Sequence, residues 1–208
     1  MTDSNYTAML VILDRSGSMW SIRTDMEGGV RQLIAGHAGQ PGMVTVDLVT
    51  FDDVIEHTHA FADPAEVKVV LEPRGSTALY DAIGVSFAGF GAALAALPEH
   101  ARPDTVLVTI VTDGYENASR EYTAHDVKRL IETQRDVYDW DVSFIGANQD
   151  AVLEAQRIGV DAKDALTYDV ASVAPMMAAH TAKQLRRRAG DKTGYTAAER
   201  GAAKPESR

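Results

Sequence analysis

Short apolar runs alternate along the chain with stretches in which apolar residues recur every three or four positions. The runs are rich in Val, Ile, Leu and Phe and are bounded by polar or glycine-containing segments, a pattern typical of buried strands. We expect six strands, at residues 7–13, 44–51, 54–61, 105–111, 142–147 and 165–168. Strands that alternate with helices in this way form βαβ units and a mostly parallel sheet.

The stretches between these runs predict five helices, at residues 26–35, 78–97, 123–135, 150–158 and 173–187. Thr123 and Asp126 have the spacing of a capping box, which places one helix start at Thr123. No internal repeat and no interdomain linker is visible in the sequence. The pattern therefore predicts a single α/β domain, doubly wound in three layers, with helices on both faces of the sheet.

One connection cannot be a crossover. Only Asp52 and Asp53 separate the run that ends at Phe51 from the run that begins at Val54. Two residues are too few to join parallel neighbours, but they suit a hairpin. We therefore expect one antiparallel pair in the otherwise parallel sheet.

Oxygen-bearing side chains gather where two of the buried runs end and where one helix opens. Asp14, Ser16 and Ser18 follow the first run, Thr77 lies in a Gly-Ser-Thr segment, and Asp113 follows the run at 105–111. In doubly wound sheets, ligands bind beyond the carboxyl ends of the strands. Carboxylate and hydroxyl oxygens are ligands that a hard divalent cation such as Mg²⁺ accepts.

Together these segments resemble the metal-ion-dependent adhesion site (MIDAS) of von Willebrand factor A (vWA) domains. The resemblance spans roughly residues 6–169 and implies a Rossmann-like vWA fold with strand order 3-2-1-4-5-6 and one antiparallel edge strand. It also implies the metal ligands, which are Asp14, Ser16, Ser18, Thr77 and Asp113. Many relatives have Gly-Gly-Thr where this chain has Gly-Ser-Thr, a departure that leaves Thr77 in place. The stretch 143–151 resembles small stand-alone bacterial and phage versions of the domain.

The resemblance further implies a metal-dependent protein-binding module and not an enzyme. In the family pattern the two aspartates bind the ion directly or through water. If hydroxyls fill the direct positions, little negative charge touches a bound Mg²⁺, or Mn²⁺ or Ca²⁺, and the ion keeps a position for a partner's Asp or Glu carboxylate. Cytoplasmic bacterial relatives often work beside AAA+ ATPases or in phage-like and defence-associated gene sets. Such a protein is the expected partner.

Six further residues are expected to border the metal: Arg15, Trp20, Asp81, Tyr115, Glu116 and Asn117. Arg15 is expected to point outward, toward an acid or phosphate of the partner. Trp20 either belongs to the binding surface or packs on the domain. Asp81 falls one turn after Thr77, where it either orients that loop as a hydrogen-bond acceptor or is an exposed helix carboxylate. The polar loop that begins at Tyr115 is the expected source of partner specificity.

Two other functions remain open at this point. A Mg²⁺-dependent phosphotransferase of the haloacid-dehalogenase type would use Asp14 as its nucleophile, but that family has a second Asp where this chain has Ser16. A structural subunit of a phage-like particle would use the fold as an assembly surface without needing a metal. The Asp-to-Ser difference disfavours the enzyme.

Composition limits the classes of partner and the cellular compartment that we expect for the protein. The chain has 208 residues, no cysteine and a formal net charge of −10, and the negative charge argues against nucleic acid as the main partner. No apolar run approaches the roughly 20 residues that span a bilayer, and the polar first residues do not resemble a secretory signal. We therefore expect a cytoplasmic protein.

The positive charge is concentrated near the end of the chain. Residues 186–208 carry seven basic and three acidic side chains and few large apolar ones. A segment of this kind buries too little surface to offset the entropy lost on ordering. We expect a vWA domain over residues 1–185 and a basic, flexible tail over residues 186–208. The alternative is a basic peptide that docks on an acidic partner or on the acidic body of this chain.

Overall fold

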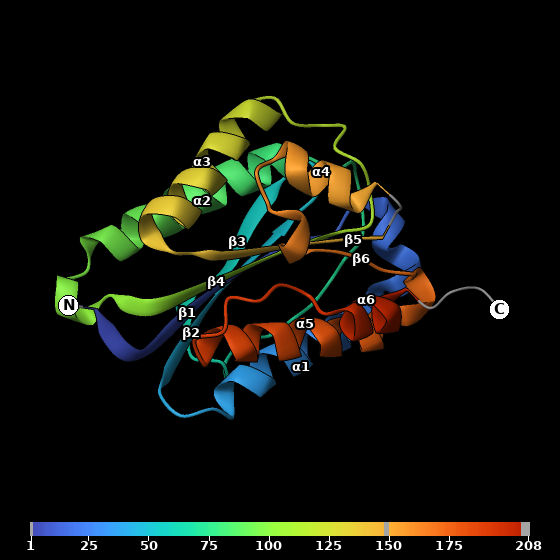
Figure 1. Ribbon diagram of the computed structural model, residues 1–208. Helices are drawn as coiled ribbons and strands as arrows, with labels where there is room; N and C mark the ends of the chain where they lie inside the picture. Colours follow the sequence, from blue (N-terminus) through green and yellow to red (C-terminus); the bar gives the residue numbers. More distant parts are fainter. Residues whose placement is uncertain (1, 148–149, 205–208) are drawn as a thin grey trace.

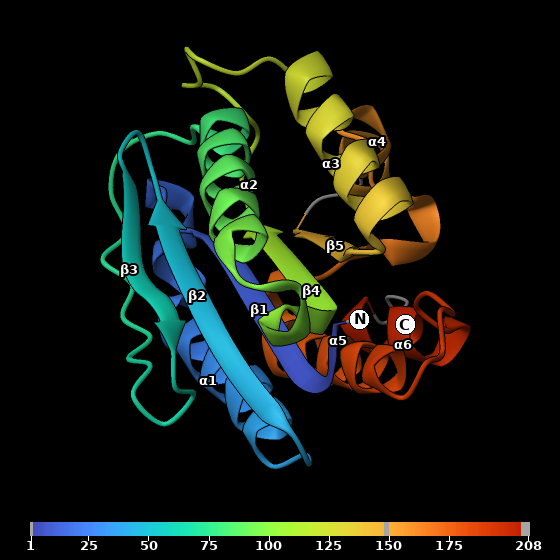
Figure 2. The same cartoon turned by 90° about the vertical axis from the view of Figure 1, so that its left-hand side faces the viewer.

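A six-stranded sheet forms the centre of the molecule, with helices on both faces (Figures 1 and 2). The computed structural model describes residues 2–147 and 150–204. The strands are β1 (Asp3–Asp14), β2 (Met43–Phe51), β3 (Ile55–Ala62), β4 (Pro103–Thr112), β5 (Asp141–Gly146) and β6 (Ala165–Thr167). The α-helices are α1 (Arg23–Ala38), α2 (Leu79–Ala96), α3 (Ala124–Tyr138), α4 (Ala151–Arg157), α5 (Val173–Arg188) and α6 (Ala197–Ala203). Short 3₁₀ turns lie at Gly17–Ile22, Glu99–Ala101, Ala162–Asp164 and Val170–Ser172.

The sheet has the order β3-β2-β1-β4-β5-β6. Every pair of neighbours is parallel except β2 and β3, which are antiparallel. The order and the antiparallel edge strand confirm the predictions made from the run pattern, the two-residue connection and the resemblance. The hairpin turn is closed by Asp52, whose carboxylate accepts a hydrogen bond from the Val54 N–H at 2.6 Å.

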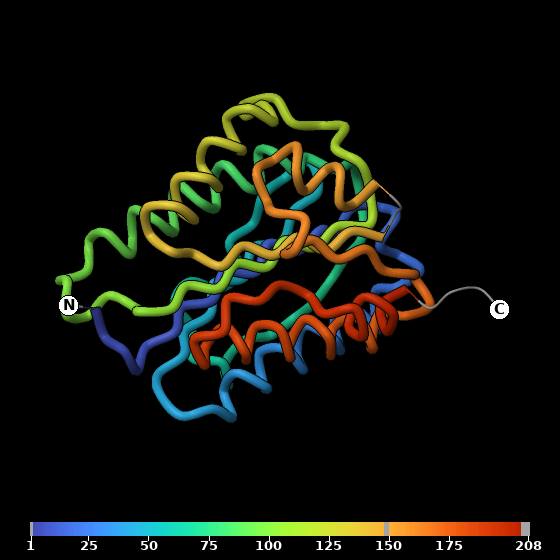
Figure 3. The backbone as a smooth tube through the Cα atoms, viewed as in Figure 1, coloured from blue at the N-terminus to red at the C-terminus, as the bar shows by residue number. Residues whose placement is uncertain are grey.

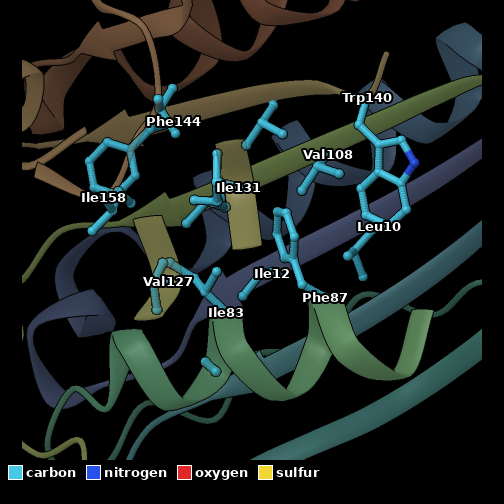
Figure 4. Close-up of a cluster of buried hydrophobic side chains, with 14 of the residues drawn as sticks. Leu10, Ile12, Ile83, Phe87, Val108, Val127, Ile131, Trp140, Phe144 and Ile158 are labelled. Carbon is cyan, nitrogen blue, oxygen red and sulfur yellow. The ribbon is translucent and has the colours of Figure 1, made fainter. Parts of the chain in front are cut away.

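The central strand β1 is buried on both faces, as expected for a sheet covered on two sides. Leu10 and Ile12 face a core beneath α2, α3 and α4, and Val11 and Leu13 face a second core beneath α1 and α5. Figure 4 shows the first core, in which Phe87 of α2 packs near Trp140. These two cores fix the sheet in the middle layer and so fix where its carboxyl edge opens.

Element boundaries differ modestly from those predicted. The first loop forms the 3₁₀ turn Gly17–Ile22 directly before α1, which begins at Arg23, three residues earlier than expected. At Thr123 the capping box is present as predicted. By length and composition, α2 is the one described helix that could cross a membrane, and half of it is buried inside the structure, as in a core helix.

The segment expected to be a flexible tail is ordered up to residue 204. Helix α5 continues to Arg188, so the boundary proposed after residue 185 falls inside a helix. The chain then turns back beside α5 and forms α6 (Figure 3). Residues 205–208 of the predicted tail lie outside the described residues. The alternative that the basic segment docks on the body of the chain describes residues 189–204 better.

A few strong anchors explain why this polar segment is ordered. Tyr195 is buried, and its hydroxyl lies 2.7 Å from Nδ1 of the buried His180. Arg186 pairs with Glu199, and Arg200 donates to the carbonyl of Ala165 at 2.7 Å. Average composition did not reveal these contacts, because one aromatic ring and two arginines provide most of them.

The buried ring of Tyr195 predicts the cost of losing this anchor. We expect Tyr195→Ala to lower the free energy of unfolding by about 3–5 kcal/mol, because it opens a cavity and removes the partner of His180. Urea denaturation measures the change. Lys192→Ala is the control: Lys192 makes an exposed ion pair with Asp139, which is worth at most about 1 kcal/mol. Equal stabilities of Tyr195→Ala and wild type would mean that the segment is a flexible tail after all.

Asp47 is a buried carboxyl group in β2, where the pairing with β3 changes register. Its Oδ2 accepts a hydrogen bond from the Phe61 N–H at 2.8 Å. Phe61 has a φ of 46°, in the left-handed region. Burial raises the pKa of Asp47 to about 6, while the hydrogen bond from Phe61 opposes that rise. Asp47 therefore takes up a proton at a higher pH in the folded protein than in the unfolded chain.

This raised pKa predicts a pH-dependent cost. An unfolded Asp has a pKa of about 3.9. The contribution of Asp47 to the stability of the folded protein is therefore fully present below pH 4 and is lost as the pH rises through about 6. Asp47→Asn keeps an acceptor for Phe61 and does not titrate. We expect its stability relative to wild type to rise between pH 4 and pH 8, by on the order of 1–3 kcal/mol. Urea denaturation at both pH values measures this change, and a difference independent of pH would contradict the assignment.

Candidate metal centre

The five expected ligands lie together at the carboxyl edge of the sheet. Asp14 ends β1, Ser16 and Ser18 follow in the first loop, Thr77 lies just before α2, and Asp113 follows β4. Strands β1 and β4 are hydrogen-bonded neighbours in parallel register. Their ends therefore bring the two aspartates to one place, at the point in the sheet where the strand order reverses.

Asp14 is completely buried, and each of its carboxylate oxygens has a donor. Oδ1 accepts from the Ser16 N–H at 2.6 Å, and Oδ2 accepts from the Thr112 hydroxyl at 2.6 Å. Burial raises the pKa of Asp14 to about 6; the bonds from Thr112 and Ser16 lower it, and the neighbouring charge of Asp113 raises it. A nearby cation would favour the ionised form of this group.

Three hydroxyl groups converge beside the two carboxylates. Ser16 Oγ and Ser18 Oγ lie 3.1 Å apart, and Ser18 donates to Asp113 Oδ1 at 2.5 Å. A Cβ placed on Gly114 would lie 3.1 Å from Thr77 Oγ1, 3.5 Å from Ser18 Oγ and 3.8 Å from Ser16 Oγ. The three hydroxyls thus border one small space that a glycine leaves open. An oxygen-lined space next to buried carboxylates fits a hard divalent cation.

Hydroxyl ligands are a necessary part of any such centre. In residues 2–147 and 150–204, no three His, Cys, Asp or Glu side chains are grouped so that they could hold a metal ion. The two aspartates of this edge would therefore need the serine and threonine oxygens to complete a ligand set. This composition agrees with the set inferred from the resemblance.

Asn117 holds Thr77 in place. Its side-chain oxygen accepts from the Thr77 N–H at 2.9 Å, and its own N–H donates to the Thr77 carbonyl at 3.0 Å. Gly75, with a φ of 65°, makes the turn before Thr77 and accepts from the Gly17 N–H at 3.3 Å. The three segments of the site are therefore tied to one another through the backbone.

Glu116 and Asp81 tie the start of α2 to the loop after β4. Glu116 accepts from the Tyr80 N–H at 3.0 Å. The carboxylate of Asp81 accepts three backbone N–H groups at 2.7–2.9 Å, those of Arg120, Glu121 and Tyr122. Asp81 is thus not an exposed helix carboxylate, but the loop that it orients is the one after β4 and not the loop of Thr77. Glu116 and Asn117 were expected to set partner specificity, but their side chains make hydrogen bonds within the domain.

The expectation that Arg15 points outward is wrong. Arg15 is buried; its Nε donates to Asp52 at 3.1 Å and an Nη donates to Glu56 at 2.6 Å. Asp52 lies close to Arg15 because the turn between β2 and β3 is at the same edge of the sheet as the end of β1. Glu56 raises the pKa of Arg15 through its hydrogen bond, so the guanidinium remains charged and secures the turn beside the site.

Two aromatic side chains are open to solvent near the candidate centre. Trp20 is 66% exposed, and the guanidinium of Arg23 lies 5.2 Å from its ring centre. Tyr115 is 59% exposed, and its hydroxyl donates to Asp150 at 3.2 Å. Trp20 is therefore on the surface and not packed into the domain, and both rings can contact a partner.

Sequence reasoning missed Thr112 and Gly114. Thr112 was given no role of its own, although its hydroxyl donates to Asp14. Gly114 was given no role, although it leaves the space among the hydroxyls. A polar residue on an otherwise apolar strand and a glycine just after a ligand were the available signals.

The phosphotransferase alternative is disfavoured by the same geometry. A nucleophilic aspartate needs an oxygen that can reach its substrate. Asp14 is fully buried and both of its oxygens accept short hydrogen bonds. Its position suits an anchoring role in the site.

Comparisons with known proteins show which solved structures have a similar fold. No protein-family model and no curated protein matches the sequence. A solved von Willebrand factor type A structure from Catenulispora acidiphila matches with a TM-score of 0.60 at 20% identity, over 87% of this chain and 43% of that chain. The fold is vWA-like. Proximal thread matrix protein 1 from the mussel byssus, with a zinc-occupied MIDAS motif, matches with a TM-score of 0.60 at 18% identity, over 83% of this chain and 46% of that one.

A third solved structure that matches is the minor pilin PilB from Streptococcus sanguinis. It matches with a TM-score of 0.60 at 13% identity, over 88% of this chain and 61% of the pilin chain. This chain therefore covers less than two thirds of the length of each of these structures. At such identities the likeness extends to the fold alone.

The open space at Gly114 gives a direct test of the centre. We expect Gly114→Ala to weaken Mn²⁺ binding at least tenfold, because the added methyl group would lie among the three hydroxyls. Mn²⁺ titration followed by electron paramagnetic resonance of the free ion measures affinity. Gly89→Ala is the matched control, since a Cβ there meets nothing within 4 Å. Equal Mn²⁺ affinity of Gly114→Ala and wild type would place any metal elsewhere.

Proposed function

We propose that the protein is a divalent-metal-dependent protein-interaction module and not an enzyme. The observation that carries the proposal is the convergence of three hydroxyls on one space beside the carboxylates of Asp14 and Asp113. Asp14, Ser16, Ser18, Thr77 and Asp113 would hold the ion, as in an intact MIDAS. Mg²⁺ is the proposed ion, with Mn²⁺ or Ca²⁺ as substitutes.

The ligand set explains why such a centre would bind an acidic partner. When bound, the ion supplies positive charge and a coordination position that a carboxylate can take. Ser16, Ser18 and Thr77 contribute neutral oxygens, so the only negative charge that the site brings to the ion is that of Asp14 and Asp113. Asp14, fixed by two donors, supplies a carboxylate from the sheet side. An Asp or Glu of a partner protein therefore completes the set.

The vWA-like fold supports this proposal in general terms. The mussel thread protein with a similar fold has a MIDAS motif occupied by zinc, so a divalent ion in such a motif has a precedent. The exposed rings of Trp20 and Tyr115 offer apolar area beside the centre, and aromatic side chains are enriched at binding hot spots.

We further propose the protein type, the compartment and the partner that were inferred from the sequence. The chain would belong to the small stand-alone bacterial or phage-like type and act in the cytoplasm, which agrees with the absence of cysteine. Its partner would be a protein with an accessible Asp or Glu, such as an AAA+ ATPase or a component of a phage-like or defence complex. Nucleic acid is a poor candidate because the net charge is −10.

A pull-down from host lysate tests the proposal. Tagged protein in Mg²⁺ is expected to retain a partner that is lost in EDTA, because the ion links the two proteins. Ser18→Ala is expected to lose the same partner, since Ser18 Oγ is one of the three converging hydroxyls. We prefer Ser18→Ala to Asp14→Ala because the Asp14 carboxylate is buried and its loss would also remove the short hydrogen bond that Thr112 donates to it.

The control bait for this experiment is Gly89→Ala, which should behave like wild type. Recovery of the same proteins from wild type, EDTA-treated protein and Ser18→Ala would contradict metal-gated binding. That pattern would instead favour the metal-independent assembly subunit considered from the sequence.

A further inference from the structure

Tyr168 has a buried hydroxyl group without a partner. The residue directly follows β6, and its side chain belongs to the core beneath α1 and α5. Only 1% of Tyr168 is exposed, and its Oη makes no hydrogen bond within the described residues. A buried unpaired hydroxyl is costly, whereas a phenylalanine ring would fill the same volume without that cost.

The position of Tyr168 brings it toward the candidate centre. Its N–H donates to the Gly146 carbonyl at 3.0 Å, Gly146 pairs with Thr112, and Thr112 directly precedes Asp113. Neighbouring strands lie about 4.8 Å apart, so the backbone of Tyr168 is only about 10 Å from that of Thr112. Two facing side chains can bridge such a distance.

Electrostatics agrees with this placement. Burial raises the pKa of the Tyr168 hydroxyl, and the charges of Asp113 and then Asp14 raise it further. The group therefore remains a protonated donor near the two carboxylates. Asp14 already has a donor on each oxygen, whereas Asp113 receives the Ser18 hydroxyl on Oδ1. Asp113 is thus the acceptor with remaining capacity.

We infer that Tyr168 is a positioning residue of the metal centre, whose hydroxyl would donate to Asp113 once an ion is bound and so orient that carboxylate toward the ion. The inference rests on the proposed metal-binding function. Hydrogen-bond donors behind a metal ligand fix its orientation, and their loss typically weakens metal affinity about 10- to 100-fold. Because Tyr168 approaches from the buried side of the sheet edge, it would act without touching the partner.

Tyr168→Phe separates this role from simple packing. We expect the variant to bind Mn²⁺ about tenfold more weakly than wild type, measured by electron paramagnetic resonance of the free ion. In EDTA its urea denaturation midpoint should be equal to or above that of wild type, because the buried hydroxyl has no hydrogen-bond partner within the described residues. Ser86→Ala is the matched control, since Ser86 also has a buried, unpartnered hydroxyl but lies within α2.

A double-mutant cycle with Asp113→Asn identifies the acceptor. If Tyr168 acts through Asp113, Tyr168→Phe should change Mn²⁺ affinity less than twofold in the Asp113→Asn background. An equal loss in both backgrounds, or no loss in the wild-type background, would overturn the inference while leaving the metal site intact. Failure of wild type itself to bind Mn²⁺ would overturn the proposed function and this inference together.

Discussion

The hydrogen bond from Thr112 to Asp14 joins the two strands on which the candidate site depends. It links the ends of β4 and β1 at 2.6 Å, in a position closed to water. The second oxygen of Asp14 binds the Ser16 N–H and so fixes the start of the first loop. A bond between buried groups is costly to leave unmade, and this constraint sets the direction in which both serine hydroxyls leave the sheet.

The other half of the site depends on a second set of internal bonds. Asp81, Glu116 and Asn117 each accept backbone N–H groups and connect the start of α2 with the loop after β4. Loops carry many functional residues but are usually mobile unless their backbone groups are paired. Here carboxylates and an amide take the place of regular secondary structure. Thr77 and Asp113 are therefore held at a fixed separation by residues that need not touch an ion.

Much of the fold could be predicted because apolar periodicity and connection length are local properties. The strands, their order and the single antiparallel pair follow from runs such as 105–111, from the two-residue turn at Asp52 and from the family resemblance. The orientation of Arg15 could not be predicted, since it depends on Asp52 and Glu56 reaching the same edge from a different strand. The order of residues 189–204 likewise depends on the single buried ring of Tyr195, which average composition hides.

The candidate ligands could be predicted only in part. Their residue types could be recognised in the sequence, but the space between their hydroxyls exists because Gly114 has no side chain. Under the proposed function, charge explains why that space matters. The chain has a net charge of −10, so an acidic partner approaches against repulsion that salt screens only in part. A divalent cation at the site would offset the charges of Asp14 and Asp113 and offer a coordination position at one point of the surface. Recognition of a carboxylate would then be confined to that point, and it would be lost with the ion.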